Sequence, residues 1–201
     1  MKDKNNLKSQ KQKILNSTTY KHFDHVTNVQ RSEYSTVNIK MRRFINGYRS
    51  DTFLLNAKLI ITEIKRCLKL SRDIILSGGV ILIVCPSNLK SRLTDIFTPT
   101  NQTIFVDSKI QSYGMFTNYK VGSEEGTGNN SIQKLPNLII FLGASAKVSR
   151  ETSKLFIPSI AFLNINDPSY DCDYVIPVGN FSDKILLFYG NLIMQSITLK
   201  I

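Results

Sequence analysis

Three short apolar runs constrain the fold of this chain more than any other feature of its sequence. They lie within residues 80–85, 138–142 and 159–163, and they lack the polar alternation of a strand with one face in water. Strands of this kind are typical of parallel sheets that are covered on both faces. The core is therefore predicted to be a buried sheet.

Amphipathic stretches alternate with these runs. Apolar residues recur at helical spacing through residues 59–75, and Gly78 and Gly79 end that helix because glycine accepts the left-handed conformation of a C-cap. The other predicted elements are strands at 53–55 and 103–106 and helices near 88–97, near 148–156 and from 182 onward. Such an alternation requires right-handed crossovers that cover both sheet faces. We predict an α/β fold: a doubly wound, flavodoxin-like, mainly parallel sheet with helices on both faces and a basic N-terminal extension.

Positive charge is concentrated near the N-terminal end. Residues 1–50 hold eleven of the 26 Lys and Arg residues but three of the 15 acidic ones, a net charge of +8 out of +11. A basic segment beside a nearly neutral body is typical of an arm that neutralises phosphates on a polyanion. A lysine-rich tail that only keeps the chain soluble would have a similar composition.

These observations predict the domain organisation. The length favours one domain over two. We place a basic N-terminal arm and RNA-contacting segment at residues 1–50, and a single α/β domain at residues 51–201. A loop rich in Gly, Asn and Ser at residues 121–134 is expected to be flexible.

Aromatic residues, Phe44 and Tyr48 among them, are interleaved with the basic ones between residues 20 and 50. This mixture suits phosphate contacts combined with stacking on unpaired bases, so RNA is the predicted polyanion. The side chains expected to hold phosphates are Lys21, Lys40, Arg42, Arg43 and Arg49.

Enzymatic chemistry finds little support in the sequence. Gly143, Ala144 and Ser145 follow a strand and open a helix, but no Lys-Ser/Thr pair or second glycine accompanies them, which favours a tight turn over a phosphate loop. The acidic cluster Asp167, Asp171 and Asp173 could bind a divalent ion or carry acid/base work, although turns produce the same pattern. A nucleotide- or sugar-phosphate-binding enzyme that uses Gly143–Ser145 with Asp167 and Asp173 is the alternative hypothesis.

The histidines and cysteines indicate neither a metal centre nor a nucleophile. His22 and His25 lack partners at recognisable ligand spacing apart from Asp24, and RNA contact or local packing explains them better. The three cysteines are Cys67, Cys85 and Cys172, and their number and spacing favour free thiols in a reducing compartment. We therefore predict no catalytic residue, no metal ligand, no cofactor and no small-molecule substrate.

Membrane insertion and import by a presequence are not expected either. No apolar run reaches the roughly 18 to 20 residues of a membrane span, so the protein is expected to be soluble. The first twenty residues contain Lys but no Arg and include Asp3, which is a poor match to an organellar presequence.

Several segments resemble the ribosomal protein S-two family of the small subunit. The stretches LPNLIIFLG and IPSIAFLNINDPSYDCDYVIP are similar to its C-terminal half, and HFDH at His22–His25, Lys40–Met41 and YGMFTNY at Tyr113–Tyr119 resemble its upstream motifs. The chain departs from the family where Asp24 and Tyr113 replace glycines, where Asn28 stands in place of the usual Arg, and where a Trp-Asn-Pro before Lys40 is absent. Residues 121–134 also stand where bacterial members carry a long coiled-coil hairpin.

The resemblance implies a structural role without catalysis. Small-subunit ribosomal RNA and neighbouring small-subunit ribosomal proteins would be the partners, and His22, His25, Thr117 and Asn118 would join the RNA-binding residues. The loss of the hairpin and the high content of Ile, Lys and Asn resemble a mitochondrial member, placed in the matrix as part of the ribosome, with a plastid as the weaker expectation. A gene in the organelle would need no presequence. An RNA-binding regulator that acts outside the ribosome on the same fold remains a third hypothesis.

Overall fold

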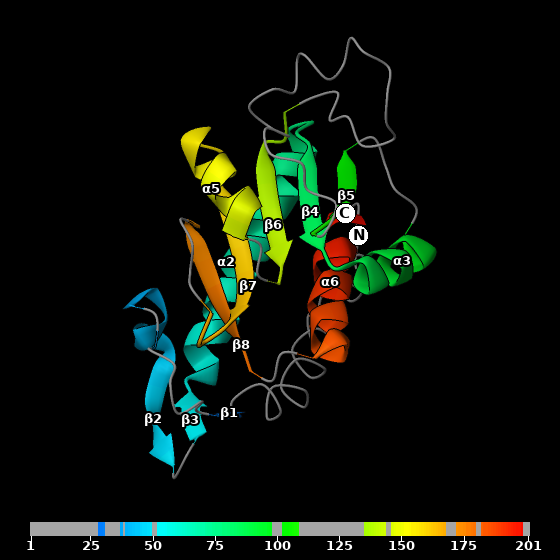
Figure 1. Cartoon of the computed structure of the whole chain (residues 1–201). Coiled ribbons are helices and arrows are strands. Elements are labelled where there is room, and N and C mark those ends of the chain that lie inside the picture. Colours follow the sequence, from blue (N-terminus) through cyan, green and yellow to red (C-terminus); the bar gives the residue numbers. More distant parts are fainter. Residues whose placement is uncertain are drawn as a thin grey trace, which may run out of the picture.

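The body of the protein is built around a parallel sheet in this computed structural model (Figure 1). The structure describes residues 28–30, 37, 39–49, 52–97, 102–108, 135–143, 146–167, 172–179 and 182–198. Within these ranges five strands form an all-parallel sheet in the order β5-β4-β6-β7-β8. Their bounds are β4 Ile81–Cys85, β5 Thr103–Asp107, β6 Leu138–Leu142, β7 Ser159–Asn164 and β8 Tyr174–Val178.

Helices cover both faces of this sheet. They are α2 (Ala57–Leu76), α3 (Ser87–Ile96), α5 (Ala146–Lys154) and α6 (Asp183–Thr198). The connections β4-α3-β5 and β6-α5-β7 run toward opposite edges, so right-handed crossovers place α3 and α5 on opposite faces. On the α3 face, α6 packs against both α2 and α3 (Figure 1). The predicted doubly wound α/β fold is confirmed.

A second, smaller sheet lies beside the β8 edge (Figure 1). It is antiparallel, in the order β1-β3-β2, and consists of β1 (Asn28–Gln30), β2 (Ile45–Arg49) and β3 (Thr52–Leu55). A 3-10 helix, η1 (Ile39–Phe44), precedes β2 and packs against β8. The strand predicted at 53–55 is therefore present, but it belongs to this sheet. The boundary predicted between residues 50 and 51 falls between two paired strands.

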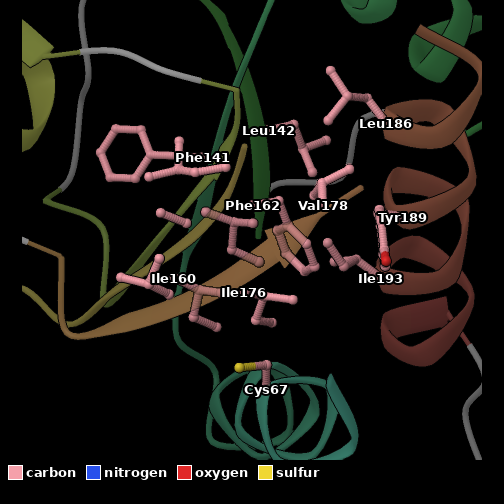
Figure 2. Packing of buried hydrophobic residues seen from close by; sticks show 14 of the residues in the cluster. Cys67, Phe141, Leu142, Ile160, Phe162, Ile176, Val178, Leu186, Tyr189 and Ile193 are labelled. Atoms are coloured by element: carbon pink, nitrogen blue, oxygen red, sulfur yellow. The ribbon is translucent and has the colours of Figure 1, made fainter. Parts of the chain in front are cut away.

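The α6 helix fills the centre of the core with an aromatic side chain. Tyr189 is fully buried, and its ring packs on Phe162 of β7 with centroids 4.9 Å apart (Figure 2). The centroid of the Phe188 ring lies 5.6 Å from that of Tyr189. Its hydroxyl has no hydrogen-bond partner among the described residues. Burial also raises the pKa of Tyr189 well above its usual value, because the phenolate cannot be solvated there. The ring therefore stabilises the core while its hydroxyl opposes that stability.

Replacing Tyr189 by Phe is expected to stabilise the protein. The change keeps the packing of the ring and removes a buried polar group without a partner, which is worth about 1 kcal/mol or more in the free energy of unfolding. Denaturant unfolding measures this quantity, with Phe162→Leu as a control that loses ring packing and lowers stability. A Tyr189→Phe variant less stable than the wild type would contradict this account of the hydroxyl.

Candidate nucleic-acid interface

The described part of the predicted RNA-binding set lies on two consecutive elements. Lys40, Arg42 and Arg43 lie on η1, and Arg49 is the last residue of β2. The remaining predicted residues, Lys21, His22, His25, Thr117 and Asn118, lie outside the described residues, as does the predicted loop at 121–134. We refer to Arg42, Arg43 and Arg49, whose side chains are exposed, as the basic surface.

The 3-10 helix that carries Arg42 and Arg43 is anchored in the protein core. Met41 and Phe44 are 0% and 1% exposed and belong to the same apolar cluster as the parallel sheet. Lys40 Nζ donates a hydrogen bond of 2.8 Å to the carbonyl oxygen of Cys172, just before β8. The backbone N–H of Asn56 donates to the Phe44 carbonyl at 2.7 Å. These contacts hold η1, and with it Arg42 and Arg43, in a fixed position on the α/β body.

One expectation for this segment changes with the structure. Phe44 was counted among the aromatic residues available for stacking, yet it is buried and belongs to the core cluster. Lys40 was also expected to hold phosphate, and that expectation stays a prediction: the residue is exposed, and its ammonium group donates a hydrogen bond to the Cys172 carbonyl. Tyr48, by contrast, remains 66% exposed and is available to a ligand.

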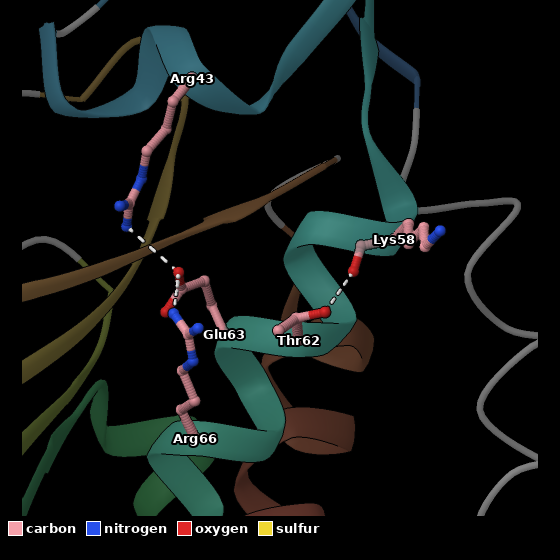
Figure 3. Close-up of polar contacts among 5 residues, drawn as sticks. All are labelled: Arg43, Lys58, Thr62, Glu63 and Arg66. Atoms are coloured by element: carbon pink, nitrogen blue, oxygen red, sulfur yellow. Dashed lines mark hydrogen bonds and ion pairs between the residues drawn. The ribbon is translucent and has the colours of Figure 1, made fainter.

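Arg43 is oriented by an acidic residue on α2. Its Nη2 lies 3.8 Å from Glu63 Oε1, the same oxygen to which Arg66 Nη1 donates at 3.1 Å (Figure 3). The guanidinium also lies 4.7 Å from the centroid of the Phe44 ring. One carboxylate faces two guanidinium groups, so the cluster keeps a net positive charge. Exposed ion pairs contribute little to stability, and with Arg43 59% exposed the pair mainly sets its direction.

An open hollow of about 470 Å³ lies beside the basic surface. It is formed where η1 meets the small sheet, and its lining residues are Val37, Arg42, Ile45, Asn46, Gly47, Tyr48 and Phe53. The β2-β3 pairing shifts by one residue between Ile45 and Gly47, which makes Asn46 the bulged residue. Sequence reasoning missed Asn46, and the adjoining Gly47 is the only local signal, since glycine in a strand often marks a bulge.

The residues of the alternative enzyme site do not meet at one place. Gly143 follows β6 and Asp167 follows β7, so both lie at the carboxyl edge of the sheet. Asp173 lies at the opposite edge, where its carboxylate accepts hydrogen bonds from Ser159 N at 2.9 Å and Ser159 Oγ at 3.1 Å. Asp173 thus links the start of β7 to the start of β8. Ala144, Ser145 and Asp171 lie outside the described residues.

Asp167 closes a local turn. Its Oδ2 accepts a hydrogen bond of 3.1 Å from Asn164 N, while its own N–H donates to the Asn164 carbonyl at 3.0 Å. Burial raises the pKa of Asp167, and the hydrogen bond from Asn164 opposes that rise. This geometry matches the turn that the sequence favoured over acid/base work.

The described ranges contain neither a cluster of metal-ligating side chains nor a membrane-spanning helix. No three His, Cys, Asp or Glu side chains there come close enough together to share a metal ion. None of the helices in those ranges has the length and apolar content needed to cross a bilayer.

A scan against protein-family models found no match to this chain, and a search of curated proteins found none either.

The three cysteines are free and buried. Burial raises the pKa of Cys67 to about 12, with the Glu63 carboxylate adding to the rise. Burial likewise raises the pKa of Cys85 to about 12, and it also raises the pKa of Cys172. A thiol in this state is a poor nucleophile because the thiolate is the reactive form.

All three thiols are therefore expected to resist modification in the folded protein at pH 8. A disulfide reagent such as dithionitrobenzoate should react fully in denaturant, but in buffer only as fast as the protein opens. Reaction of any of them in buffer at the rate of an exposed cysteine would contradict the burial described.

The same thiols predict a pH dependence of stability. Their folded pKa values lie above the ordinary value of 9.0, so unfolding releases protons once the pH exceeds about 9. The free energy of unfolding is expected to fall as the pH rises from about 9 toward 12, and Tyr189 adds to the fall. A Cys67→Ala, Cys85→Ala double variant should lose less stability over that interval, as measured by denaturant unfolding at each pH.

Proposed function

We propose that this protein is a structural constituent of the small ribosomal subunit in mitochondria, where it binds ribosomal RNA and neighbouring ribosomal proteins. The observation that carries the proposal is the basic surface on η1 and β2, anchored to an α/β body that carries little net charge. A polyanion can bind such a surface without a conformational change of the protein.

The electrostatics of this surface favour a nucleic-acid backbone as the ligand. Guanidinium groups bind phosphates through paired N–H donors, and Arg42, Arg43 and Arg49 present them on neighbouring elements. Contacts to phosphates position a protein on RNA, while the shape of the RNA decides where they can form.

The resemblance to the ribosomal protein S-two family supports the same assignment. Its C-terminal motifs occupy β6, β7 and β8, three neighbouring strands of the parallel sheet. Lys40 belongs to the Lys-Met pair that resembles a motif of this family, and its Nζ donates a hydrogen bond to the carbonyl of Cys172, just before β8. Two segments that carry the resemblance are thus in direct contact although they lie far apart in the sequence. The outer faces of the helices are then available to neighbouring ribosomal proteins.

Charge reversal on η1 tests the RNA contact. An Arg42→Glu, Arg43→Glu variant is expected to bind small-subunit ribosomal RNA at least tenfold more weakly at moderate salt. The slope of log affinity against log salt should fall by about 0.7 to 0.9 for each lost phosphate contact. Filter binding at several salt concentrations measures both quantities, and co-sedimentation with small ribosomal subunits should weaken in parallel.

The matched control reverses the same charge elsewhere. Arg92 on α3 and Arg150 on α5 are exposed and lie outside the basic surface, so Arg92→Glu, Arg150→Glu changes the net charge equally. This control is expected to retain most of the affinity. Equal losses in the two variants would mean that net charge alone attracts the RNA, and the proposed interface would be wrong.

A further inference from the structure

The hollow between η1 and the small sheet has an apolar floor and a polar rim. Phe53 is almost completely buried beneath it, and Val37 and Ile45 are half-buried beside it. Arg42, Asn46 and Tyr48 are exposed around it. Polar and apolar groups line this open hollow in similar measure, and its volume is about 470 Å³.

Each rim residue offers a contact that suits a flat heteroaromatic ring. The Tyr48 ring packs on Phe53, with centroids 5.3 Å apart and an interplanar angle of 58°, yet two-thirds of the residue stays exposed. The Asn46 amide carries both donors and an acceptor, and the bulge takes this residue out of the regular pairing with β3. The Arg42 guanidinium can stack on a ring or hold an adjoining phosphate.

We propose that this hollow binds an unpaired nucleobase of single-stranded RNA, stacked on Tyr48 and read at its edge by Asn46. The inference rests on the proposed function, since it names the part of the RNA that this surface receives. Arg42 belongs to both the hollow and the basic surface, so a strand whose phosphates lie on Arg42 and Arg43 can place a base in the hollow. None of the described residues that line it carries a carboxylate to repel the backbone.

A single-stranded segment suits this site better than a duplex does. In an A-form helix the bases are stacked and the major groove is too deep and narrow for side chains to read them. A loop, bulge or strand end can instead turn a base outward onto an aromatic side chain, and such stacking tolerates any base. The one amide at the rim adds a modest preference for bases that pair with both its donor and its acceptor.

The test compares a short single-stranded oligoribonucleotide with the same strand carrying abasic sites, which keeps the phosphates but removes the bases. Tyr48→Ala is expected to weaken binding of the intact strand at least about fivefold, while leaving its salt slope and the affinity for the abasic strand unchanged. Tyr48→Phe should restore wild-type binding because it keeps the stacking surface. Phe156→Ala, at a fully exposed aromatic outside the hollow, is the matched control and should bind as the wild type does.

The outcomes separate this inference from the proposed function. If the wild type binds intact and abasic strands equally, or if Tyr48→Ala binds the intact strand as well as the wild type, no base enters the hollow, while the phosphate contacts of the proposed function stand. If the wild type binds neither strand nor ribosomal RNA, the proposed function fails as well. Denaturant unfolding of each variant shows whether a loss of binding comes from a loss of fold. If Tyr48→Ala does not fold, Asn46→Ala decides the question, and it should weaken binding of the intact strand only.

Discussion

The burial of β4 and β6 is the constraint on which the rest of the molecule depends. Every side chain of these two central strands is buried, so apolar layers must cover both faces of the sheet. The helices α2, α3 and α6 supply one layer and α5 contributes to the other. Polar groups lie at the strand ends, on the outer helix faces and in the small sheet, although Tyr189 brings a hydroxyl into the core. Asp173 is an example at the strand ends, because its carboxylate accepts hydrogen bonds from Ser159 and so links the start of β8 to the start of β7.

The anchoring of η1 links this core to the proposed function. Met41 and Phe44 enter the core cluster from a segment that is otherwise basic and exposed, and Lys40 bonds to the chain before β8. Burial of two large apolar side chains contributes far more to stability than the exposed ion pair between Arg43 and Glu63. Apolar contacts therefore determine where the positive charge lies.

The sequence predicted the parts of the fold that depend on local pattern. β4, β6 and β7 were visible as apolar runs, and α2 was visible as a helical period that ends before Gly78, whose φ of 79° matches the expected left-handed cap. β8 was missed because it contains Pro177, and a proline argues against a strand. Proline is tolerated chiefly in edge strands, and β8 is an edge strand of the sheet. β1 and β2 were missed because they are short and show no clear alternation of polar and apolar residues. η1 was missed because a 3-10 helix leaves no usable period. The arginines of the candidate site could be predicted from the sequence. The bulge at Asn46 could not, because it depends on the β2-β3 register, which composition does not encode.

Membership of the ribosome is the central claim, and copy number tests it most directly. Quantitative mass spectrometry of mitochondrial ribosomes, washed at moderate salt and separated into subunits, measures this chain against established small-subunit proteins. The account predicts one copy per small subunit and none in the large subunit. A chain found mainly in ribosome-free fractions, or bound in a small fraction of subunits, would contradict the account and favour an RNA-binding regulator that acts outside the ribosome.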